Sequence, residues 1–164
     1  MKKNTHIIGG LTLALVLEKV FFKDLDKATI KIAIDLGMYY SFSVLGSLLP
    51  DIDKKNSSLG KKFPKVSTML NKTVGHRTMT HSIPFVLLVY ILLYYININE
   101  YITNGITIGI LSHILLDLMN RQGVCLLYPF KKKYHFFKIK TSSTLEKVTR
   151  YIMIIILFVF IIYR

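Results

Sequence analysis

The chain has 164 residues, of which 52% are hydrophobic, and its mean hydropathy is +0.44. This length fits one domain, residues 1–164, and the composition is more apolar than that of most soluble domains of this size. A formal net charge of +13 would indicate nucleic-acid binding in a soluble protein, but basic loops between apolar segments more simply face anionic lipid headgroups. We therefore expect a small multi-pass membrane protein whose partners are membrane lipids, and no nucleic acid.

Five apolar segments predict an all-α bundle of about five membrane helices, at residues 4–17, 30–50, 78–99, 103–119 and 148–163. Segment 78–99 is the clearest span, because no formal charge lies between Arg77 and Glu100. At about 1.5 Å per residue, this segment crosses a hydrocarbon layer of roughly 30 Å. The other four are shorter, and buried helices of a soluble protein or half-inserted segments are alternatives for them.

Basic residues gather on one side of this five-span arrangement. If the amino terminus is cytoplasmic, Lys2, Lys3 and the loops at 51–81 and 119–150 carry 17 of the 22 Lys and Arg residues. This is the positive-inside pattern, and it predicts two basic cytoplasmic loops with room for short amphipathic helices on the membrane surface. The remaining basic residues fall on the opposite side, where acidic residues balance them.

Several smaller features fit a membrane bundle. After Lys2 and Lys3 the first apolar segment lacks a small-residue cleavage site, so we expect it to be retained and not removed as a signal peptide. The single cysteine, Cys125, excludes an intrachain disulfide and a sulfur-based metal site, and we expect it to be a packing residue. Glycines at 46, 105 and 109 would let helices approach closely.

Two carboxylates follow the second apolar segment. Pro50 is expected to end the helix, and an extended segment would then aim Asp51 and Asp53 the same way. Paired carboxylates suit a divalent cation, and one of them, for which we take Asp53, can accept a proton from bound water. The simpler alternative is an acidic helix end exposed to solvent.

Two histidines precede the third apolar segment. His76 and His81 would differ by about 140° on a helix, so at least one must lie before the helix begins. Thr80 or Ser82 can cap that helix, with Pro84 in its first turn. Arg77 is suited to grip a phosphate or carboxylate bidentately, which would make it a catalytic residue. Alternatively, Arg77 contacts lipid headgroups and the histidines bond loop carbonyls.

A histidine and a carboxylate lie together on the fourth segment. His113 and Asp117 are at positions i and i+4, on one face of a helix. This spacing fits metal ligation or a carboxylate that orients an imidazole, and a buried hydrogen bond is the alternative. His6 begins the first apolar segment, where an interfacial role is equally compatible with the pattern, and His135 is expected in a solvated loop.

The five-span topology places these side chains at one depth, on the cytoplasmic side. The topology rests on apolar length and basic charge alone, so this agreement favours a shared site. The predicted metal donors are His6, Asp51, Asp53, His76, His81, His113 and Asp117. Seven nitrogen and oxygen donors exceed the three or four that one zinc ion takes, which indicates two ions or some supporting residues.

The polar segments, in this order, resemble those of the YdjM-type, LexA-regulated, membrane-bound metal-dependent hydrolases of bacteria. The resemblance covers most of the chain. Its motifs are the His6 segment, residues 49–53 leading into 58–60, Gly75, His76 and Arg77 with residues 80–82, Gly109 with residues 112–115 and Asp117, and Gly123 followed by residues 126–129. The resemblance implies a multi-pass protein of the bacterial inner membrane and metal-dependent hydrolysis, and it implies no particular substrate.

Two functions are therefore compared. In the first, one or two divalent cations, zinc or manganese, activate water for ester hydrolysis, with a phosphoester of a lipid or lipid-linked molecule as the first substrate class to test. In the second, the protein is not an enzyme, and the cluster is a structural metal site or part of an ion or proton pathway. A pathway needs polar residues on both sides of the membrane, whereas the outer halves of the segments offer few beyond Asp35, Ser41 and Ser43. This favours the first function.

Overall fold

The computed structural model describes residues 1–22 and 29–163. The elements are α1 (Lys3–Phe21), α2 (Ile30–Gly46), the 3₁₀ helix η1 (Pro50–Asp53), α3 (Ser58–Lys62), α4 (Pro64–Thr73), the 3₁₀ helix η2 (Met79–His81), α5 (Ile83–Tyr95), α6 (Glu100–Leu118) and α7 (Thr144–Ile162). Within these residues there is no β-strand, only two isolated bridges in the loop after α6. The predicted all-α class is confirmed. Some residues of the charge comparison, Lys23, Asp24, Asp26, Lys27 and Arg164, lie outside the described residues.

Helices α2 and α6 form the most extensive helix pair, and glycines permit their close approach. A Cβ atom at Gly105 would lie 2.5 Å from the carbonyl oxygen of Tyr39, closer than real Cβ atoms come to a neighbour. A Cβ at Gly46 or at Gly109 would meet backbone carbonyl groups of the facing helix even more closely. The predicted close approach at these three glycines is confirmed, and it sets the spacing of the two helices.

Helix α1 packs against both α2 and α6, and hydrogen bonds fix its position along α2. The Tyr39 hydroxyl donates to the carbonyl of Ala14 at 2.9 Å, and the Ser43 hydroxyl donates to the carbonyl of Gly10 at 2.8 Å. Both bonds are buried, where a hydrogen bond left unmade costs about 1 to 3 kcal/mol. Because α1 cannot slide along α2 without breaking them, they fix the height of the first turn of α1 in the bundle.

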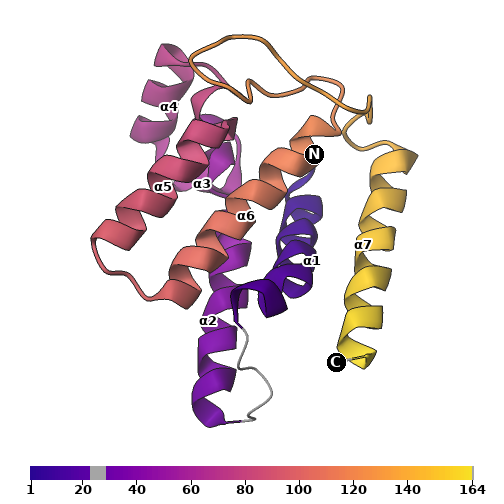
Figure 1. Cartoon of the computed structure of the whole chain (residues 1–164). Coiled ribbons are helices and arrows are strands. Elements are labelled where there is room, and N and C mark those ends of the chain that lie inside the picture. Colours follow the sequence, from indigo (N-terminus) through magenta and orange to yellow (C-terminus); the bar gives the residue numbers. More distant parts are fainter. Residues whose placement is uncertain (23–28, 164) are drawn as a thin grey trace.

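One end of the bundle collects most of the long connections, and we call it the basic end (residues 1–3, 47–82 and 119–143). Figure 1 shows the amino terminus, the carboxyl end of α6, and helices α3 and α4 at this end. The carboxyl end of α1, the amino end of α2 and the turn from α5 to α6 lie at the opposite end. Short helices expected in the loops occur as α3 and α4, whereas the loop from α6 to α7 contains none.

Among residues 1–22 and 29–163, two helical stretches are long and apolar enough to cross a membrane: Ile30–Asp53, which comprises α2 and η1, and Glu100–Leu118, which is α6. The clearest span predicted from the sequence, residues 78–99, is not one continuous helix, and its crossing of a membrane is unconfirmed. Helix α5 has 13 residues, about 20 Å at 1.5 Å per residue, because Ser82 caps its start and the chain turns at Asn97, where φ is +53°. The five-span arrangement therefore stays a prediction.

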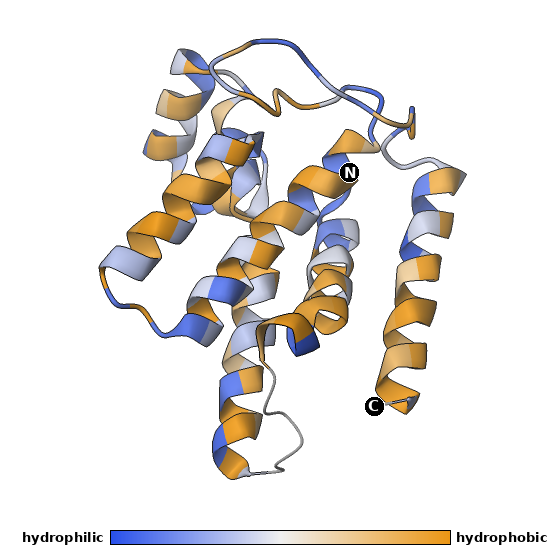
Figure 2. Ribbon diagram, viewed as in Figure 1, coloured by the Kyte–Doolittle hydropathy of each residue, from blue (hydrophilic) through white to orange (hydrophobic). Residues whose placement is uncertain are grey.

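Helices α5 and α7 expose much apolar surface. Leu88 and Ile91 on α5 are 63% and 61% exposed, and Ile155 and Phe158 on α7 are 60% and 65% exposed. Figure 2 shows hydrophobic residues around most of α5 and along the carboxyl-terminal two thirds of α7. Apolar surface of this extent is typical of contact with lipid or with another protein.

Candidate metal centre

All seven predicted donors lie at the basic end or in the helix turns next to it, and they form one cluster. They come from α1 (His6), η1 (Asp51 and Asp53), the segment before α5 (His76 and His81) and α6 (His113 and Asp117). The structure brings them into three groups, His6 with His113 and Asp117, Asp51 with His81 and His113, and Asp53 with His76 and His81. In each group one donor atom per residue lies within 4.8 Å of the others. Because His81 and His113 belong to two groups each, the groups are continuous.

The imidazoles of His81 and His113 face each other at the middle of this cluster. Their Nε2 atoms are 3.2 Å apart, and both side chains are fully buried. Nδ1 of His113 lies 2.6 Å from the carbonyl oxygen of Ser47, which can only accept a hydrogen bond. The proton of neutral His113 is therefore on Nδ1, and its Nε2 presents a lone pair towards His81.

Asp117 lies against this histidine pair. Its Oδ2 atom is 3.6 Å from Nε2 of His81 and 3.8 Å from Nε2 of His113. The prediction that His113 and Asp117 share one face of a helix is confirmed, because they are one turn apart on α6 and both point into the cluster. The carboxylate is itself buried, and close packing against α1 and α2 keeps water away from this face of α6.

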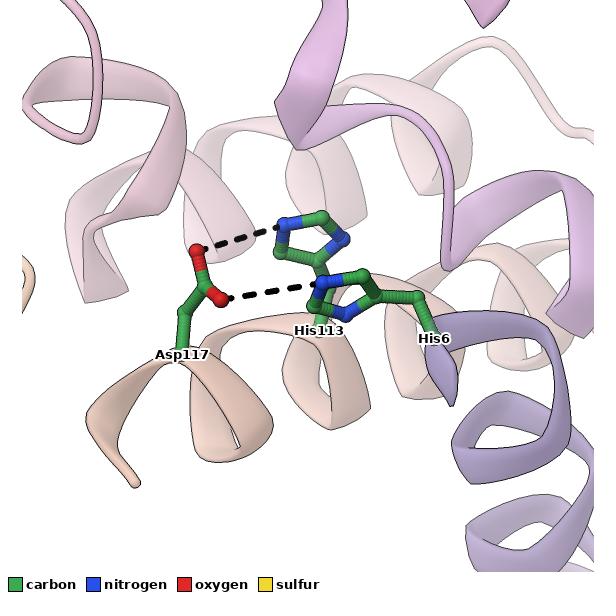
Figure 3. A group of neighbouring side chains, drawn as sticks. All are labelled: His6, His113 and Asp117. Carbon is green, nitrogen blue, oxygen red and sulfur yellow. Dashed lines mark ion pairs between the residues drawn. The ribbon is translucent and has the colours of Figure 1, made fainter. Parts of the chain in front are cut away.

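His6 adds a third imidazole from α1. Its ring stacks on that of His113 with centroids 3.7 Å apart and planes 9° apart, and its Nε2 lies 3.6 Å from Oδ1 of Asp117. Figure 3 shows both imidazoles turned towards the same carboxylate. Nδ1 of His6 is buried and has no hydrogen-bond partner. A buried polar atom without a partner is rare in folded proteins, so it marks a place where a group is expected to bind or to rearrange.

Asp53 supports the histidines from the other side of His81. Its Oδ1 lies 2.6 Å from Nδ1 of His76, and its Oδ2 lies 3.5 Å from Nδ1 of His81. The same Oδ2 accepts hydrogen bonds from the backbone N–H of Arg77 at 3.0 Å and from the Thr80 hydroxyl at 2.7 Å. A carboxylate bonded to the far nitrogen of an imidazole fixes the ring and its tautomer, as in many metal sites.

Asp51 and Asp53 do not point the same way, contrary to the sequence prediction. The expected extended segment is the 3₁₀ helix η1, which begins at Pro50. With three residues per turn, positions two apart differ by about 240°. Asp53 is fully buried beside His76, whereas Asp51 is partly exposed and approaches His113. The two carboxylates therefore contribute to different parts of the cluster.

Arg77 is held at Asp117 by two contacts. Its Nε is 2.9 Å from Oδ2 and its Nη2 donates to Oδ1 at 3.1 Å, while Nη1 donates to the side-chain oxygen of Gln122 at 2.8 Å. The φ angle of Arg77 is +64°, an uncommon conformation for a residue other than glycine. The amino group of Met1 also donates to Oδ1 of Asp117, at 2.9 Å. The negative charge of Asp117 is thus balanced by two cations, the guanidinium of Arg77 and the amino group of Met1.

The residues present fit a divalent cation. Each of the three donor groups combines two imidazoles and one carboxylate, which are donors that zinc and manganese accept in proteins. Two tetrahedral ligands of zinc, each about 2.0 to 2.1 Å from the ion, lie about 3.3 to 3.4 Å apart. The 3.2 Å between Nε2 of His81 and Nε2 of His113 is close to that separation. The separations from these nitrogens to Oδ2 of Asp117 are only slightly longer, at 3.6 and 3.8 Å.

Sequence reasoning missed residues that support the donors. The sequence predicts Thr80 as a helix cap and as part of a family motif, and it does not predict that the Thr80 hydroxyl bonds Asp53 and lies 3.0 Å from Nδ1 of His81. Ser47 accepts a hydrogen bond through its backbone carbonyl, and Gln122 accepts one through its side-chain amide. No sequence pattern indicates either contact. The one signal in the sequence for such support is that Thr80 directly precedes His81. A threonine next to a histidine is too common to indicate a role by itself.

Glu146, at the start of α7, was also missed. It accepts hydrogen bonds from the backbone N–H groups of Lys2 and Ser142, each at 2.5 Å, and from the Thr5 hydroxyl at 3.0 Å. Burial raises the pKa of its carboxyl, but these hydrogen bonds outweigh burial and hold the pKa below its ordinary value. Glu146 therefore ties α7 to the turn of α1 that carries His6.

Two sequence expectations outside the cluster agree with the structure. His135 is exposed in the loop between α6 and α7, away from the donor groups. Cys125 is 1% exposed and packs in the same loop, as expected of a packing residue.

Comparison with known proteins gives the family. The whole chain, residues 1–164, matches the family described as "YdjM inner membrane protein". The chain is 31% identical over 129 residues to "Uncharacterized protein YvsG" of Bacillus subtilis (strain 168), covering 79% of this chain and 74% of that protein. It is also 31% identical over 142 residues to "Inner membrane protein YdjM" of Escherichia coli (strain K12), covering 82% of this chain and 68% of that protein. No solved structure matches. In agreement with the resemblance found in its polar segments, the chain belongs to the YdjM inner membrane protein family.

Proposed function

We propose that this protein is a membrane-bound, metal-dependent hydrolase whose site binds one or two divalent cations, zinc or manganese. The observation that carries the proposal is the facing pair of Nε2 atoms on His81 and His113, 3.2 Å apart, with the buried carboxylate of Asp117 beside both. Burying three imidazoles and two carboxylates together costs several kcal/mol unless they are paired or bind an ion. Arg77 and the Met1 amino group pair with Asp117, but neither contacts the nitrogens of the histidine pair.

A divalent cation bound there would supply a Lewis acid and lower the pKa of water towards about 7, so that hydroxide is available near neutral pH. The protein's own residues would orient and balance this chemistry. Asp53 and Thr80 hold the Nδ1 side of His81, and the carbonyl of Ser47 holds the Nδ1 side of His113. Each ring is thereby fixed with Nε2 directed at the cluster before any ligand binds.

We assign proton transfer to the η1 carboxylates. Asp53, our candidate from the sequence, already accepts hydrogen bonds from Thr80 and the backbone of Arg77 and is fully buried. Asp51 is partly exposed, and its carboxylate receives no hydrogen bond from the described residues. The position of Asp51 suits a group that accepts a proton from water and releases it to solvent, so Asp51 is the better candidate.

Arg77 is the candidate for holding anionic oxygens of the reacting group. Nε forms an ion pair with Asp117 and Nη2 donates to it, whereas among the described residues Nη1 bonds only the neutral amide oxygen of Gln122. A hydrogen bond between a guanidinium and an anion is roughly twice as strong as one to a neutral group. An anionic substrate oxygen would therefore compete well with Gln122 for this donor.

We further propose that the chain is a multi-pass protein of the bacterial cytoplasmic membrane with the basic end in the cytoplasm. Support comes from two helices of spanning length, from the exposed apolar surfaces of α5 and α7, and from the concentration of lysine at the basic end. The relatives from Escherichia coli and Shigella flexneri carry the name inner membrane protein. In this orientation the site opens at the level of lipid headgroups, so a phosphoester of a lipid or lipid-linked molecule is the substrate class to test first.

The test uses the full chain purified in detergent. Elemental analysis should find zinc or manganese in wild-type protein and in His135→Ala, and little in His113→Ala. Hydrolysis of phosphatidic acid and of p-nitrophenyl phosphate should then follow metal content. Metal that is bound without turnover of any ester would instead support a structural metal site.

A further inference from the structure

A cavity of about 240 Å³ opens beside the donor cluster at the basic end. Its walls come from the amino-terminal residues, from the end of α2 through η1 to the start of α3, and from the loop before α7. The residue of interest in its wall is Asp51, whose carboxylate oxygen lies within 4.8 Å of donor atoms of His81 and His113. The cavity therefore reaches the same carboxylate that approaches the buried histidine pair.

Three lysines line this cavity, Lys2, Lys3 and Lys54. Within residues 1–22 and 29–163, none of their ammonium groups forms an ion pair. Asp51 is the one acidic residue in the wall, so the three ammonium charges exceed the carboxylate charge by two. Like charges gathered around a hollow repel each other, and an anion bound between them removes that repulsion.

We infer that this cavity, called here the lysine pocket (Lys2, Lys3, Asp51, Lys54 and the neighbouring wall), binds the phosphate of a phosphomonoester substrate. A phosphomonoester carries about −1.5 to −2 charges at pH 7, which complements an excess of two positive charges, whereas a carboxylic ester carries none. Ligand sites for whole drug-sized molecules measure roughly 300 to 1,000 Å³. A pocket of 240 Å³ therefore accepts the phosphate and the atoms next to it, and the rest of the substrate stays outside.

Because the pocket lies beside the donor cluster, a bound phosphomonoester would be hydrolysed at its phosphorus atom. The catalytic part of the inference, unlike the binding of phosphate, rests on the proposed hydrolytic function. The oxygen of water would bond to phosphorus, and the bond between phosphorus and the ester oxygen would break. One proton of the water would end on the leaving alcohol and the other on inorganic phosphate, so no further reactant is needed. Asp51 lines the pocket and its carboxylate lies within 4.8 Å of donor atoms of His81 and His113, so phosphate bound in the pocket would lie next to the cluster.

The binding half is tested without turnover, using inorganic phosphate and the full chain in detergent. Isothermal titration should give the same dissociation constant for wild-type protein and for Lys55→Ala, because Lys55 is exposed beside Lys54 but does not line the pocket. The double variant Lys3→Ala with Lys54→Ala should bind phosphate about tenfold more weakly, the effect expected when charge-assisted contacts are lost. All three lysines are exposed, so these variants should keep the wild-type melting temperature.

Equal phosphate affinity in the double variant and in Lys55→Ala, at unchanged metal content, would contradict the inference that the lysine pocket binds phosphate. Failure of the hydrolase proposal looks different: wild-type protein would bind no metal, yet phosphate affinity would still depend on Lys3 and Lys54. Competition then identifies the source of the phosphate. Displacement by phosphatidic acid in micelles supports a lipid headgroup, displacement by glycerol 3-phosphate supports a soluble substrate, and displacement by neither overturns the phosphomonoester assignment.

Discussion

The Nε2 atoms of His81 and His113 lie 3.2 Å apart, although 32 residues separate the two histidines in the chain. Each ring is held from its Nδ1 side by a different partner, Thr80 or the backbone of Ser47. Two rings held in this way cannot turn apart without losing a buried hydrogen bond. The pair is therefore a preorganised feature of the fold, and it is the first place to test for metal binding.

Replacing His81 or His113 by alanine should abolish metal binding. Each change removes a nitrogen directed at the centre of the cluster, and we expect a loss of affinity greater than about 100-fold, the upper range for residues that only support a ligand. His135→Ala is the matched control, because His135 is exposed and outside the donor groups. Metal per chain is measured after dialysis at fixed free zinc. Full occupancy in both cluster variants would exclude these histidines as ligands.

Asp53→Asn should weaken metal binding by about 10 to 100-fold and leave some binding in place. The amide keeps the shape of the carboxylate but removes the charge that favours the proton on Nδ1 of His76 and His81. The readout is the dissociation constant for zinc, measured by competition with a chelator. Asp35→Asn, on α2 and outside the donor groups, should bind zinc like wild type. Complete loss of binding would instead make Asp53 a direct ligand.

Gly109→Ala should lower stability by about 1 to 3 kcal/mol, the usual cost of overpacking a tight contact. The new methyl group would meet the backbone carbonyl of Ser43 and the backbone N–H of Ser47, neither of which can move independently of α2. Gly37→Ala is the control: its Cβ would meet nothing within 4 Å, and alanine is the better helix former by about 1 kcal/mol. Thermal unfolding in detergent should therefore shift in opposite directions for the two variants.

Glu146 should make stability depend on pH in the acid range. Its pKa is lower in the folded protein than in the unfolded chain, so its stabilisation is present above the unfolded pKa and is lost as pH falls through the folded pKa. Wild-type protein should thus lose more melting temperature between pH 6 and pH 3 than Glu146→Gln does. At pH 7 the variant should be less stable by about 1 to 2 kcal/mol, because charge-assisted hydrogen bonds become neutral ones. If the melting temperatures of the two proteins fall in parallel with pH, Glu146 is not the source of the pH dependence.

The membrane arrangement can be tested by labelling single cysteines in a Cys125→Ser background. Lys55→Cys lies at the basic end, and Asn97→Cys lies in the turn between α5 and α6 at the opposite end. We expect a membrane-impermeant thiol reagent to label Asn97→Cys in intact spheroplasts, and Lys55→Cys only after the membrane is opened. Labelling of both positions from outside would contradict the proposed topology.

The sequence predicted much of the cluster because its signals are short-range or collective. His113 and Asp117 share a helix face by their spacing alone, and basic charge placed the loops that carry Asp51 and His81 at one end. The small residues Gly105 and Gly109 correctly marked the helix contact. These features follow from helix geometry and from the distribution of basic charge, so any chain with the same residue spacing is expected to show them.

Other features could not be read from the sequence, because they depend on where the chain leaves a helix. Hydropathy extends unbroken through residues 78–99, yet α5 begins only at Ile83, whose backbone N–H donates to the carbonyl of Leu126 in a distant loop. The contact of Arg77 with Asp117 requires a φ of +64° at Arg77. An arginine in the sequence does not indicate this backbone conformation. Glu146 bonds the backbone of Lys2, and backbone groups are identical at every position.

The location of Asp117 near the end of α6 also has a consequence for biosynthesis. Nitrogen atoms of His6, His81 and His113 all lie within 3.8 Å of its oxygens, and it is the last of the seven donors to leave the ribosome. Until α6 has been synthesised, His6 on α1 and the aspartates of η1 have no α6 to pack against. The centre can close only once α6 is in place, so the site forms late in biosynthesis.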